Sequence, residues 1–221
     1  MMADVVVFGT SDFASLARFY LTHDSPHEVV AFTVERDYVP ESGRFEGLPV
    51  VPLDELSRQY PPDACLAFAP ASHYRMNTLR ERIYGLLRGA GYELVSYVSS
   101  KATRFPGLEI GDNCFVLEDN TLQPFCRIGS NVVLWSGNHV GHHATIEDHA
   151  FVTSHVVISG HCVVGRNSFI GVNATLRDGI TLGAQTYVGM ATAVTRDTAE
   201  RSVVKGNPGE VMKITSDRLE R

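Results

Sequence analysis

The 221-residue sequence lacks the features that mark several large protein classes. No run of about 18 consecutive apolar residues occurs, so we expect no transmembrane helix. Residues 1–9 have neither the basic region nor the small-residue cleavage site of a signal peptide, which favours a cytoplasmic location. The four cysteines form no Cys-x-x-Cys pair, which leaves out the common metal and redox spacings.

Strong charge is also absent. Charged residues make up 20% of the chain and the formal net charge is -6, which argues against nucleic acid or an anionic membrane as a partner. The hydrophobic content of 44% is enough for one large domain or two modest ones.

The first part of the chain, residues 1–98, alternates strand and helix patterns. Short β-branched or aromatic runs predict buried strands, and apolar residues at helical spacing predict helices between them. Predicted strands span residues 4–8, 28–34, 64–69 and 93–98, and predicted helices span residues 14–21, 53–60 and 74–89. This order predicts an α/β domain with a small parallel sheet of Rossmann type.

The second part, residues 99–221, has a six-residue period. An aliphatic residue recurs at Ile110, Val116, Leu122, Ile128, Leu134, Val140, Ile146, Val152, Ile158, Val164, Ile170, Leu176, Leu182, Val188 and Val194. Such a period is typical of a parallel β-helix, in which three consecutive hexads form one triangular coil. One coil cannot bury its own core, so we expect about five stacked coils with these side chains inside.

The residue four places after each aliphatic position is also predicted to point inward, at a tight corner. Most of these residues are small, and Cys114, Cys126 and Cys162 are among them, so we interpret these cysteines as buried packing residues. The register ends after Ala199. We expect residues 203–208 to form a loop and residues 209–221 a short closing strand and helix.

Histidines are concentrated in the middle of the repeat. Four of them occupy the third place after an aliphatic residue, which is a turn or outward position: His143, His149, His155 and His161. His142 alone lies two places after its aliphatic residue, Val140. His143 and His161 are separated by one full coil, so we expect them to stack on one face.

A loop in the first part has the position of a phosphate site. Gly9-Thr10-Ser11-Asp12-Phe13 follows the first strand and opens a helix, where backbone N–H groups can bind a phosphate. The complete Gly-x-Gly-x-x-Gly pattern is absent, and an ordinary strand-to-helix turn remains the alternative. Glu35 and Arg36 follow the second strand, where such domains contact the base or ribose of a nucleotide.

The aliphatic-Gly hexads resemble those of the hexapeptide-repeat acyltransferases. The segments Tyr187-Val188-Gly189, Val194-Thr195-Arg196-Asp197 and Gly206-Asn207-Pro208 look like the end of the helix in many members. An α/β domain followed by five coils is similar to the sialic-acid O-acetyltransferase and bacillosamine-pathway N-acetyltransferase group. The resemblance implies a left-handed β-helix and a homotrimer with active sites between neighbouring subunits.

The same resemblance implies an acetyl-CoA-dependent N-acetyltransferase that acts on a nucleotide-linked amino sugar, such as a 4-amino-4,6-dideoxy sugar of glycan biosynthesis. Acetyl-CoA would be a co-substrate, and neither a metal nor a permanently bound cofactor is expected. Three alternatives remain open. They are a sugar O-acetyltransferase, a gamma-type carbonic anhydrase that binds zinc through three histidines, and a non-catalytic β-helix.

By resemblance, the general base is His142. An amine or hydroxyl must lose a proton as it attacks a thioester, and imidazole is suited to accept it. His143, grouped with His142 as catalytic, stands where family members often carry a carboxylate. We therefore expect Glu147, Asp148 or a backbone carbonyl to orient the ring of His142.

Other roles also follow from the resemblance. Gly160, one coil after the base, matches a glycine whose backbone N–H binds the developing oxyanion and lets the thioester approach closely. His161 is assigned to acetyl-CoA, with Lys205, Arg177 or Arg196 near its phosphates. The loop of residues 9–13 and the pair Glu35 and Arg36 are assigned to the sugar nucleotide. Asn138 and His139 are assigned to the same substrate.

Overall fold

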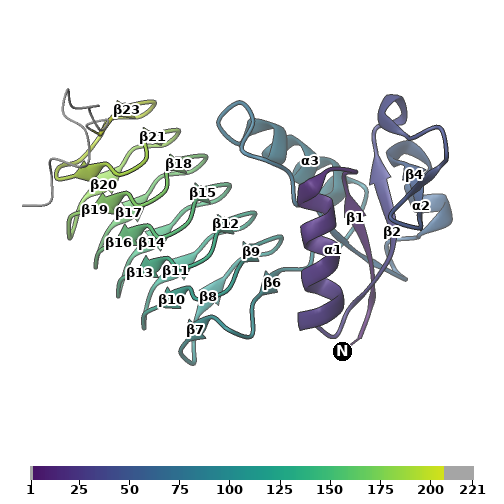
Figure 1. Cartoon of the computed structure of the whole chain (residues 1–221), viewed down its shortest axis with the longest axis horizontal. Helices are drawn as coiled ribbons and strands as arrows, with labels where there is room; N and C mark the ends of the chain where they lie inside the picture. Colours follow the sequence, from purple (N-terminus) through teal and green to yellow (C-terminus); the bar gives the residue numbers. More distant parts are fainter. Residues whose placement is uncertain (1, 207–221) are drawn as a thin grey trace, which may run out of the picture.

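The computed structural model describes residues 2–206 and divides into two parts, an α/β domain followed by a long β-helix (Figure 1). Asn207, Pro208 and the closing strand and helix expected at residues 209–221 lie outside the described residues. Among residues 2–206, no helix is both long enough and apolar enough to cross a membrane.

The α/β domain has the order that the sequence predicts. Its elements are β1 (Asp4–Phe8), α1 (Asp12–Asp24), β2 (Glu28–Val34), η1 (Arg36–Tyr38), β3 (Arg44–Phe45), β4 (Leu48–Pro52), η2 (Leu53–Glu55), α2 (Leu56–Gln59), β5 (Leu66–Phe68) and α3 (Thr78–Gly89). The sheet order is β3-β4-β2-β1-β5, and all pairings except β3–β4 are parallel. Strands β2 and β4 lie on one side of β1, and β5 lies on the other side. The strand order therefore reverses at the carboxyl end of β1, which is where such sheets bind ligands.

Two features of this domain differ from the sequence prediction. The hairpin of β3 and β4 was not expected. Glu46 and Gly47 at its turn both have positive φ, as in a two-residue hairpin turn of type I′. The strand predicted at residues 93–98 is divided. Leu94 forms a single bridge to Ala67, whereas β6 (Tyr97–Val98) pairs with the β-helix.

The second part is the left-handed parallel β-helix. Its strands are β6, β7 (Thr103–Arg104), β8 (Glu109–Ile110), β9 (Phe115–Val116), β10 (Thr121–Leu122), β11 (Arg127–Ile128), β12 (Val133–Leu134), β13 (His139–Val140), β14 (Thr145–Ile146), β15 (Phe151–Val152), β16 (Val157–Ile158), β17 (Val163–Val164), β18 (Phe169–Ile170), β19 (Thr175–Leu176), β20 (Thr181–Leu182), β21 (Tyr187–Val188), β22 (Ala193–Val194) and β23 (Val203–Val204). β23 replaces part of the loop expected at residues 203–208 and pairs with β21.

The strands form three sheets, which are the three faces of the helix. The β12 face contains β6, β9, β12, β15, β18, β21 and β23; the β13 face contains β7, β10, β13, β16, β19 and β22; the β14 face contains β8, β11, β14, β17 and β20. Strands of neighbouring coils pair in parallel, so that His139 aligns with Thr121 and Val157.

The interior of the β-helix is one continuous column of the predicted aliphatic residues. Ile110 in the first coil is partly buried, and every later member of the series from Val116 to Val194 is buried. Cys114, Cys126 and Cys162 are buried, free and part of this column. The prediction that these cysteines pack the core is confirmed.

The third-place residues of the hexads occupy corners with left-handed backbone. The four predicted turn histidines have φ values between 57° and 62°, a region in which Asn, Asp and His are enriched. His149 differs from the expectation of an outward position. It is only 6% exposed, because α3 covers its corner.

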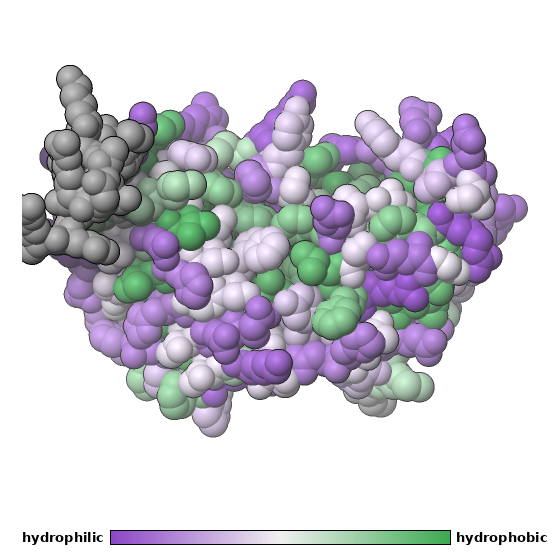
Figure 2. Space-filling view, in the orientation of Figure 1, coloured by the Kyte–Doolittle hydropathy of each residue, from purple (hydrophilic) through white to green (hydrophobic). Residues whose placement is uncertain are grey.

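The α/β domain packs on the β12 face (Figure 1). Phe13 of α1 lies edge-on to Trp135, with ring centroids 5.6 Å apart, and also contacts Phe151. Tyr20 donates a hydrogen bond to Glu118 across the same boundary. On the side shown in Figure 2, hydrophobic and hydrophilic residues are interspersed over both parts. Because the α/β domain covers the β12 face, the opposite corner, where the β13 and β14 faces meet, points away from the domain of the same chain.

One arginine fastens α3 to the β-helix. Arg80 is completely buried and donates hydrogen bonds to the carbonyl oxygens of Asn131 and His149, each at 2.6 Å. Its guanidinium has no carboxylate partner within 4 Å among the described residues. Burial lowers the pKa of Arg80 to about 9. The carbonyl oxygens of the β-helix corner thus balance a charge that is costly to bury.

Replacing Arg80 with methionine is expected to destabilise the protein by about 2–4 kcal/mol, because two buried carbonyl oxygens lose charge-assisted hydrogen bonds. Urea unfolding followed by circular dichroism measures the change. Arg58→Met, at a largely exposed position of α2, is the control and is expected to change stability little. Equal stability of Arg80→Met and the wild type would contradict this role.

The buried His149 predicts a loss of stability in acid. Asn131 donates a hydrogen bond to His149 Nδ1 at 2.8 Å, so this nitrogen must be unprotonated. Burial lowers the pKa of His149 below its ordinary value, against the opposing effect of Glu81. As the pH falls, His149 is therefore protonated in the unfolded chain before it is protonated in the folded protein. The stability that is present above the unfolded pKa of His149 is lost as the pH falls through its folded pKa.

The variant His149→Asn should be less sensitive to acid than the wild type. Asparagine already occupies the equivalent left-handed position at Asn113, Asn131 and Asn167. Urea unfolding at pH 7.5 and pH 5 should show a smaller difference in this variant, whereas His155→Asn, at an exposed turn, should behave as the wild type. An unchanged pH dependence in His149→Asn would refute the assignment.

Candidate active site

His142 lies on the corner between the β13 and β14 faces, here called the β13–β14 corner. The inward Val140 ends β13, and the chain then turns through His142 and His143 into β14. Both imidazoles are exposed. This corner lies opposite the β12 face, on which the α/β domain packs, so His142 points away from the domain of its own chain.

Three imidazoles and one phenyl ring are grouped on this corner. His142 Nδ1 lies 3.1 Å from His143 Nδ1, a hydrogen-bond distance in which one ring donates to the other. The rings of His143 and His161 stack at 4.9 Å with an angle of 12°, as expected for residues one coil apart. Phe125 covers the other side of His143. The structure thus brings His142, His143 and His161 together.

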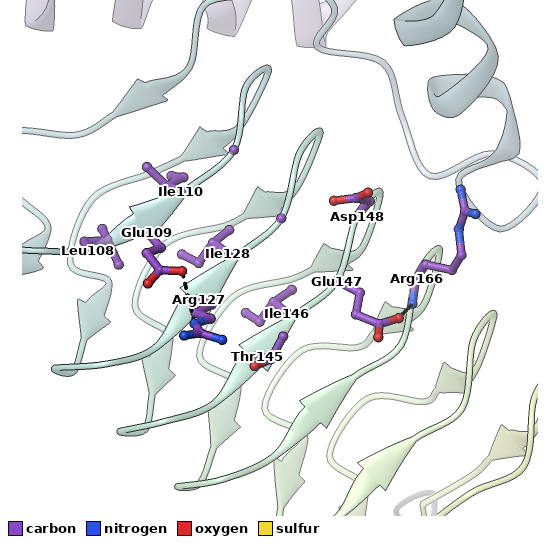
Figure 3. Close-up of a pocket in the computed structure, with 12 residues that line it drawn as sticks. Leu108, Glu109, Ile110, Arg127, Ile128, Thr145, Ile146, Glu147, Asp148 and Arg166 are labelled. Carbon is purple, nitrogen blue, oxygen red and sulfur yellow. Dashed lines mark hydrogen bonds and ion pairs between the residues drawn. The ribbon is translucent and has the colours of Figure 1, made fainter.

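The ring of His142 is not oriented by the carboxylates that the sequence suggested. Glu147 and Asp148 lie after β14, beyond the β13–β14 corner, and line a groove of about 740 Å³ (Figure 3). Glu147 accepts a hydrogen bond from the backbone N–H of Arg166, and Asp148 accepts one from Ser130. The hydrogen-bond partner of the His142 ring is His143.

Gly160 lies beneath the His142 ring, one coil further along. A Cβ atom at this position would lie 2.8 Å from His142 Cε1, 2.9 Å from His142 Nε2 and 2.9 Å from Asp178 Oδ1. The absence of a side chain therefore leaves a gap between an imidazole and a carboxylate. His142 Nε2 and Asp178 Oδ1 both border this gap.

The backbone N–H of Gly160 has no hydrogen-bond acceptor within residues 2–206. At the equivalent place one coil earlier, the His142 N–H donates to the side chain of Gln123 at 2.9 Å. Gly141 stands in the same relation to Gly160 as Gln123 does to His142. Because Gly141 has no side chain, it supplies no acceptor to the Gly160 N–H. Gly160 therefore offers a free donor on a stiff backbone, the property that an oxyanion site needs.

Two arginines follow along the same corner. Arg177 and Arg196 are exposed and lie about 10 and 14 Å further along the axis, given a strand spacing of about 4.8 Å. Neither is in an ion pair with a residue of the described chain. Lys205 follows β23 and lies on the corner between the β12 and β13 faces instead. The arginines are better placed than Lys205 for an anion that extends from His142.

The α/β domain has a cavity of its own at the carboxyl ends of β1 and β2. It measures about 530 Å³, and Thr10 and Glu35 are among its lining residues, together with Arg75 and Arg82. Arg82 donates two hydrogen bonds to the Glu35 carboxylate, at 3.0 and 2.9 Å, and holds the pKa of that carboxyl below its usual range. Two of the residues predicted to bind a sugar nucleotide, Thr10 and Glu35, thus line a cavity with both polar and apolar walls.

Other residues predicted to bind the sugar nucleotide have different roles. Arg36 forms ion pairs with Asp54 and Glu55, outside the cavity. Phe13 packs against the β-helix. Asn138 is 1% exposed and bonds to Trp135 and Val156 within the β-helix, so it is not free to contact a sugar.

The remaining predicted positions are open to a ligand. Gly9 has a φ of 112° at the end of β1, Ser11 and Asp12 are exposed at the start of α1, and His139 is half-buried on the β13 face. Sequence reasoning missed Arg75 and Arg82 because the predicted helix at residues 74–89 gave no sign of which face lines a cavity. Three consecutive residues with positive φ, from Arg75 to Asn77, delay the start of α3 to Thr78.

Comparison with known proteins agrees with the repeat and the fold. Residues 125–160 match the family model described as bacterial transferase hexapeptide (six repeats), and residues 162–196 match that of the hexapeptide repeat of succinyl-transferase. No match was found among curated proteins.

Several solved structures are similar over nearly the whole chain. Perosamine N-acetyltransferase from Caulobacter crescentus, in complex with CoA and GDP-perosamine, is 23% identical with a TM-score of 0.82, over 96% of this chain and 98% of that chain. The acetyltransferase domain of PglB from Neisseria gonorrhoeae, in complex with acetyl coenzyme A, is 19% identical with a TM-score of 0.80, over 96% and 100%. WeeI from Acinetobacter baumannii is 21% identical with a TM-score of 0.77, over 96% and 100%. Residues 125–196 thus match hexapeptide-repeat models almost throughout, and the whole chain has the same two-part fold as these solved acetyltransferase structures.

Proposed function

We propose that this protein transfers an acetyl group from acetyl-CoA to the amino group of a nucleotide-linked amino sugar, with His142 as general base. The observation that carries the proposal is Gly160, whose free N–H lies at a gap between the His142 ring and the Asp178 carboxylate. The gap brings together a base, an oxyanion donor and a group that attracts a positively charged amine. The ligands of the similar structures, CoA and GDP-perosamine, support the same pair of substrates.

The reaction follows from these groups. The ammonium form of the amino sugar first releases one proton to solvent. The neutral amine then attacks the thioester carbon, and His142 Nε2 accepts the second proton, which the new C–N bond makes acidic. The carbonyl oxygen becomes negatively charged and accepts a hydrogen bond from Gly160 N–H. The C–S bond then breaks, and His142 returns the proton to the CoA thiolate. His143 keeps the ring of His142 aligned by accepting a hydrogen bond from His142 Nδ1–H at its own Nδ1. In this tautomer the free lone pair of His142 lies on Nε2.

Asp178 favours an amine over a hydroxyl as the acceptor. An amino sugar carries a positive charge when protonated, and a carboxylate that borders the same gap as the base attracts it to the reaction site. The Asp178→Asn variant is therefore expected to raise KM for the amino sugar about tenfold, with a smaller change in KM for acetyl-CoA. Steady-state kinetics with each substrate varied separately measure this, and an unchanged KM for the sugar would remove Asp178 from the role.

The proposal places the active site between two copies of the chain. The α/β cavity lies on the side of the β12 face, whereas His142 lies on the corner opposite that face. A sugar nucleotide held by one α/β domain would therefore reach the His142 of a neighbouring copy, as in a cyclic homotrimer. Arg177 and Arg196 would bind the phosphates of CoA along the same corner.

The test is an assay of the purified protein with acetyl-CoA and a panel of UDP-, dTDP- and GDP-linked amino sugars and their hydroxyl counterparts. We expect release of free CoA and a product heavier by one acetyl group with at least one amino sugar. Mass spectrometry after fragmentation identifies the acylated atom. Acetylation of the hydroxyl counterparts alone would show the O-acetyltransferase instead, and no CoA release with any acceptor would contradict the proposal.

A further inference from the structure

Three histidines of the β13–β14 corner lie close enough to bind one ion together. His142, His143 and His161 each offer a ring nitrogen, and these atoms all lie within 4.8 Å of one another. The distance of 3.1 Å between the Nδ1 atoms of His142 and His143 is close to the roughly 3.3 Å that separates two nitrogen ligands of tetrahedral zinc. A small movement of the exposed His161 side chain completes a three-nitrogen set.

The backbone beneath these side chains is rigid. His161 N–H donates a hydrogen bond to the carbonyl oxygen of His142 at 3.0 Å, so the two coils are fixed to each other. The stacked rings of His143 and His161, and the tilted contact of Phe125 with His143, order the side chains as well. A site whose ligands are already ordered loses little entropy when the ion binds.

We propose that His142, His143 and His161 form a binding site for one divalent transition-metal ion, and that this ion inhibits acetyl transfer. Imidazole is a preferred ligand of zinc, copper and nickel. When Nδ1 of His142 binds the ion, the neutral ring carries its proton on Nε2, and when Nε2 binds the ion, its lone pair is occupied. In both cases His142 no longer accepts a proton. The inhibition rests on the proposed function, whereas the binding does not.

Binding is tested on the full chain after treatment with a chelator, with Zn²⁺ titrated against a chromophoric chelator. We expect one tightly bound zinc per chain. His143→Gln and His161→Gln should each weaken binding by at least about 100-fold, because losing a direct ligand costs more than losing an outer-shell partner. His155→Gln, an exposed turn histidine on another corner, should bind zinc as the wild type does. Equal zinc affinity in all four proteins would overturn the site.

Inhibition is tested with each protein compared with its own metal-free rate. Zinc should inhibit the wild type, a chelator should restore the rate, and His161→Gln should need more zinc for half inhibition. Full acetyl transfer by the zinc-saturated protein would overturn the inhibitory role. If no acceptor sugar is found, the binding measurement alone decides whether the site exists, so the two proposals fail separately.

Discussion

Replacing His142 with asparagine is expected to lower kcat for acetyl transfer by about 10³-fold, the scale of a lost general base. The asparagine amide can occupy the corner and accept a hydrogen bond, but it cannot take a proton from the attacking amine. The backbone N–H of this residue still donates to Gln123, so the corner should keep its shape. CoA release measured with a saturating amino sugar gives the change in kcat.

The control for this variant is His155→Asn. Both histidines are exposed corner residues of the β-helix, but His155 lies between the β12 and β13 faces, away from the cluster. Its rate should equal that of the wild type. Binding of CoA, followed by calorimetry, should persist in His142→Asn. A rate within a few fold of the wild type would remove His142 from the role of base.

The second large effect is expected for Gly160→Ala. The added Cβ would lie 2.9 Å from both His142 Nε2 and Asp178 Oδ1, so the ring or the carboxylate must move and the gap closes. Displacing a base by about 1 Å and obstructing an oxyanion donor each cost on the order of 10²-fold in rate. We therefore expect a fall in kcat of at least that size, with the fold retained.

A matched alanine substitution separates this effect from a general one. Gly85 lies on the exposed side of α3, and a Cβ there meets nothing within 4 Å. Gly85→Ala should leave the rate unchanged and raise the free energy of unfolding by about 0.5–1 kcal/mol. If Gly160→Ala were as active as Gly85→Ala, the gap would not be the reaction site.

The architecture was readable from the sequence because the β-helix repeats one simple rule. An inward aliphatic residue every six positions fixes the register, and no insertion disturbs the series from Ile110 to Val194. The strands β1 and β2 were also predicted with their observed bounds, since both are buried β-branched runs with clear breaks. The match of the coils to hexapeptide-repeat models agrees with this interpretation.

The site was predictable only in part. His142, His143 and His161 meet because each full coil brings the chain back to the same corner, which counting hexads reveals. The gap between His142 and Asp178 also follows from the spacing, because each lies one coil from Gly160, but its width depends on side-chain directions. Arg80 was missed because its partners are carbonyl oxygens 51 and 69 residues away, and backbone acceptors leave no pattern in a sequence.

The measurement that tests the central claim most directly is activity of mixed assemblies of two inactive variants. His142→Asn lacks the base, and Thr10→Asp places a negative charge at the α/β cavity, where a nucleotide phosphate is proposed to bind. If each active site joins two copies, random mixing of equal amounts should restore about a quarter of the wild-type rate, because that share of sites has both intact parts. A mixture as inactive as its components would contradict a site built from the α/β cavity of one copy and His142 of the next.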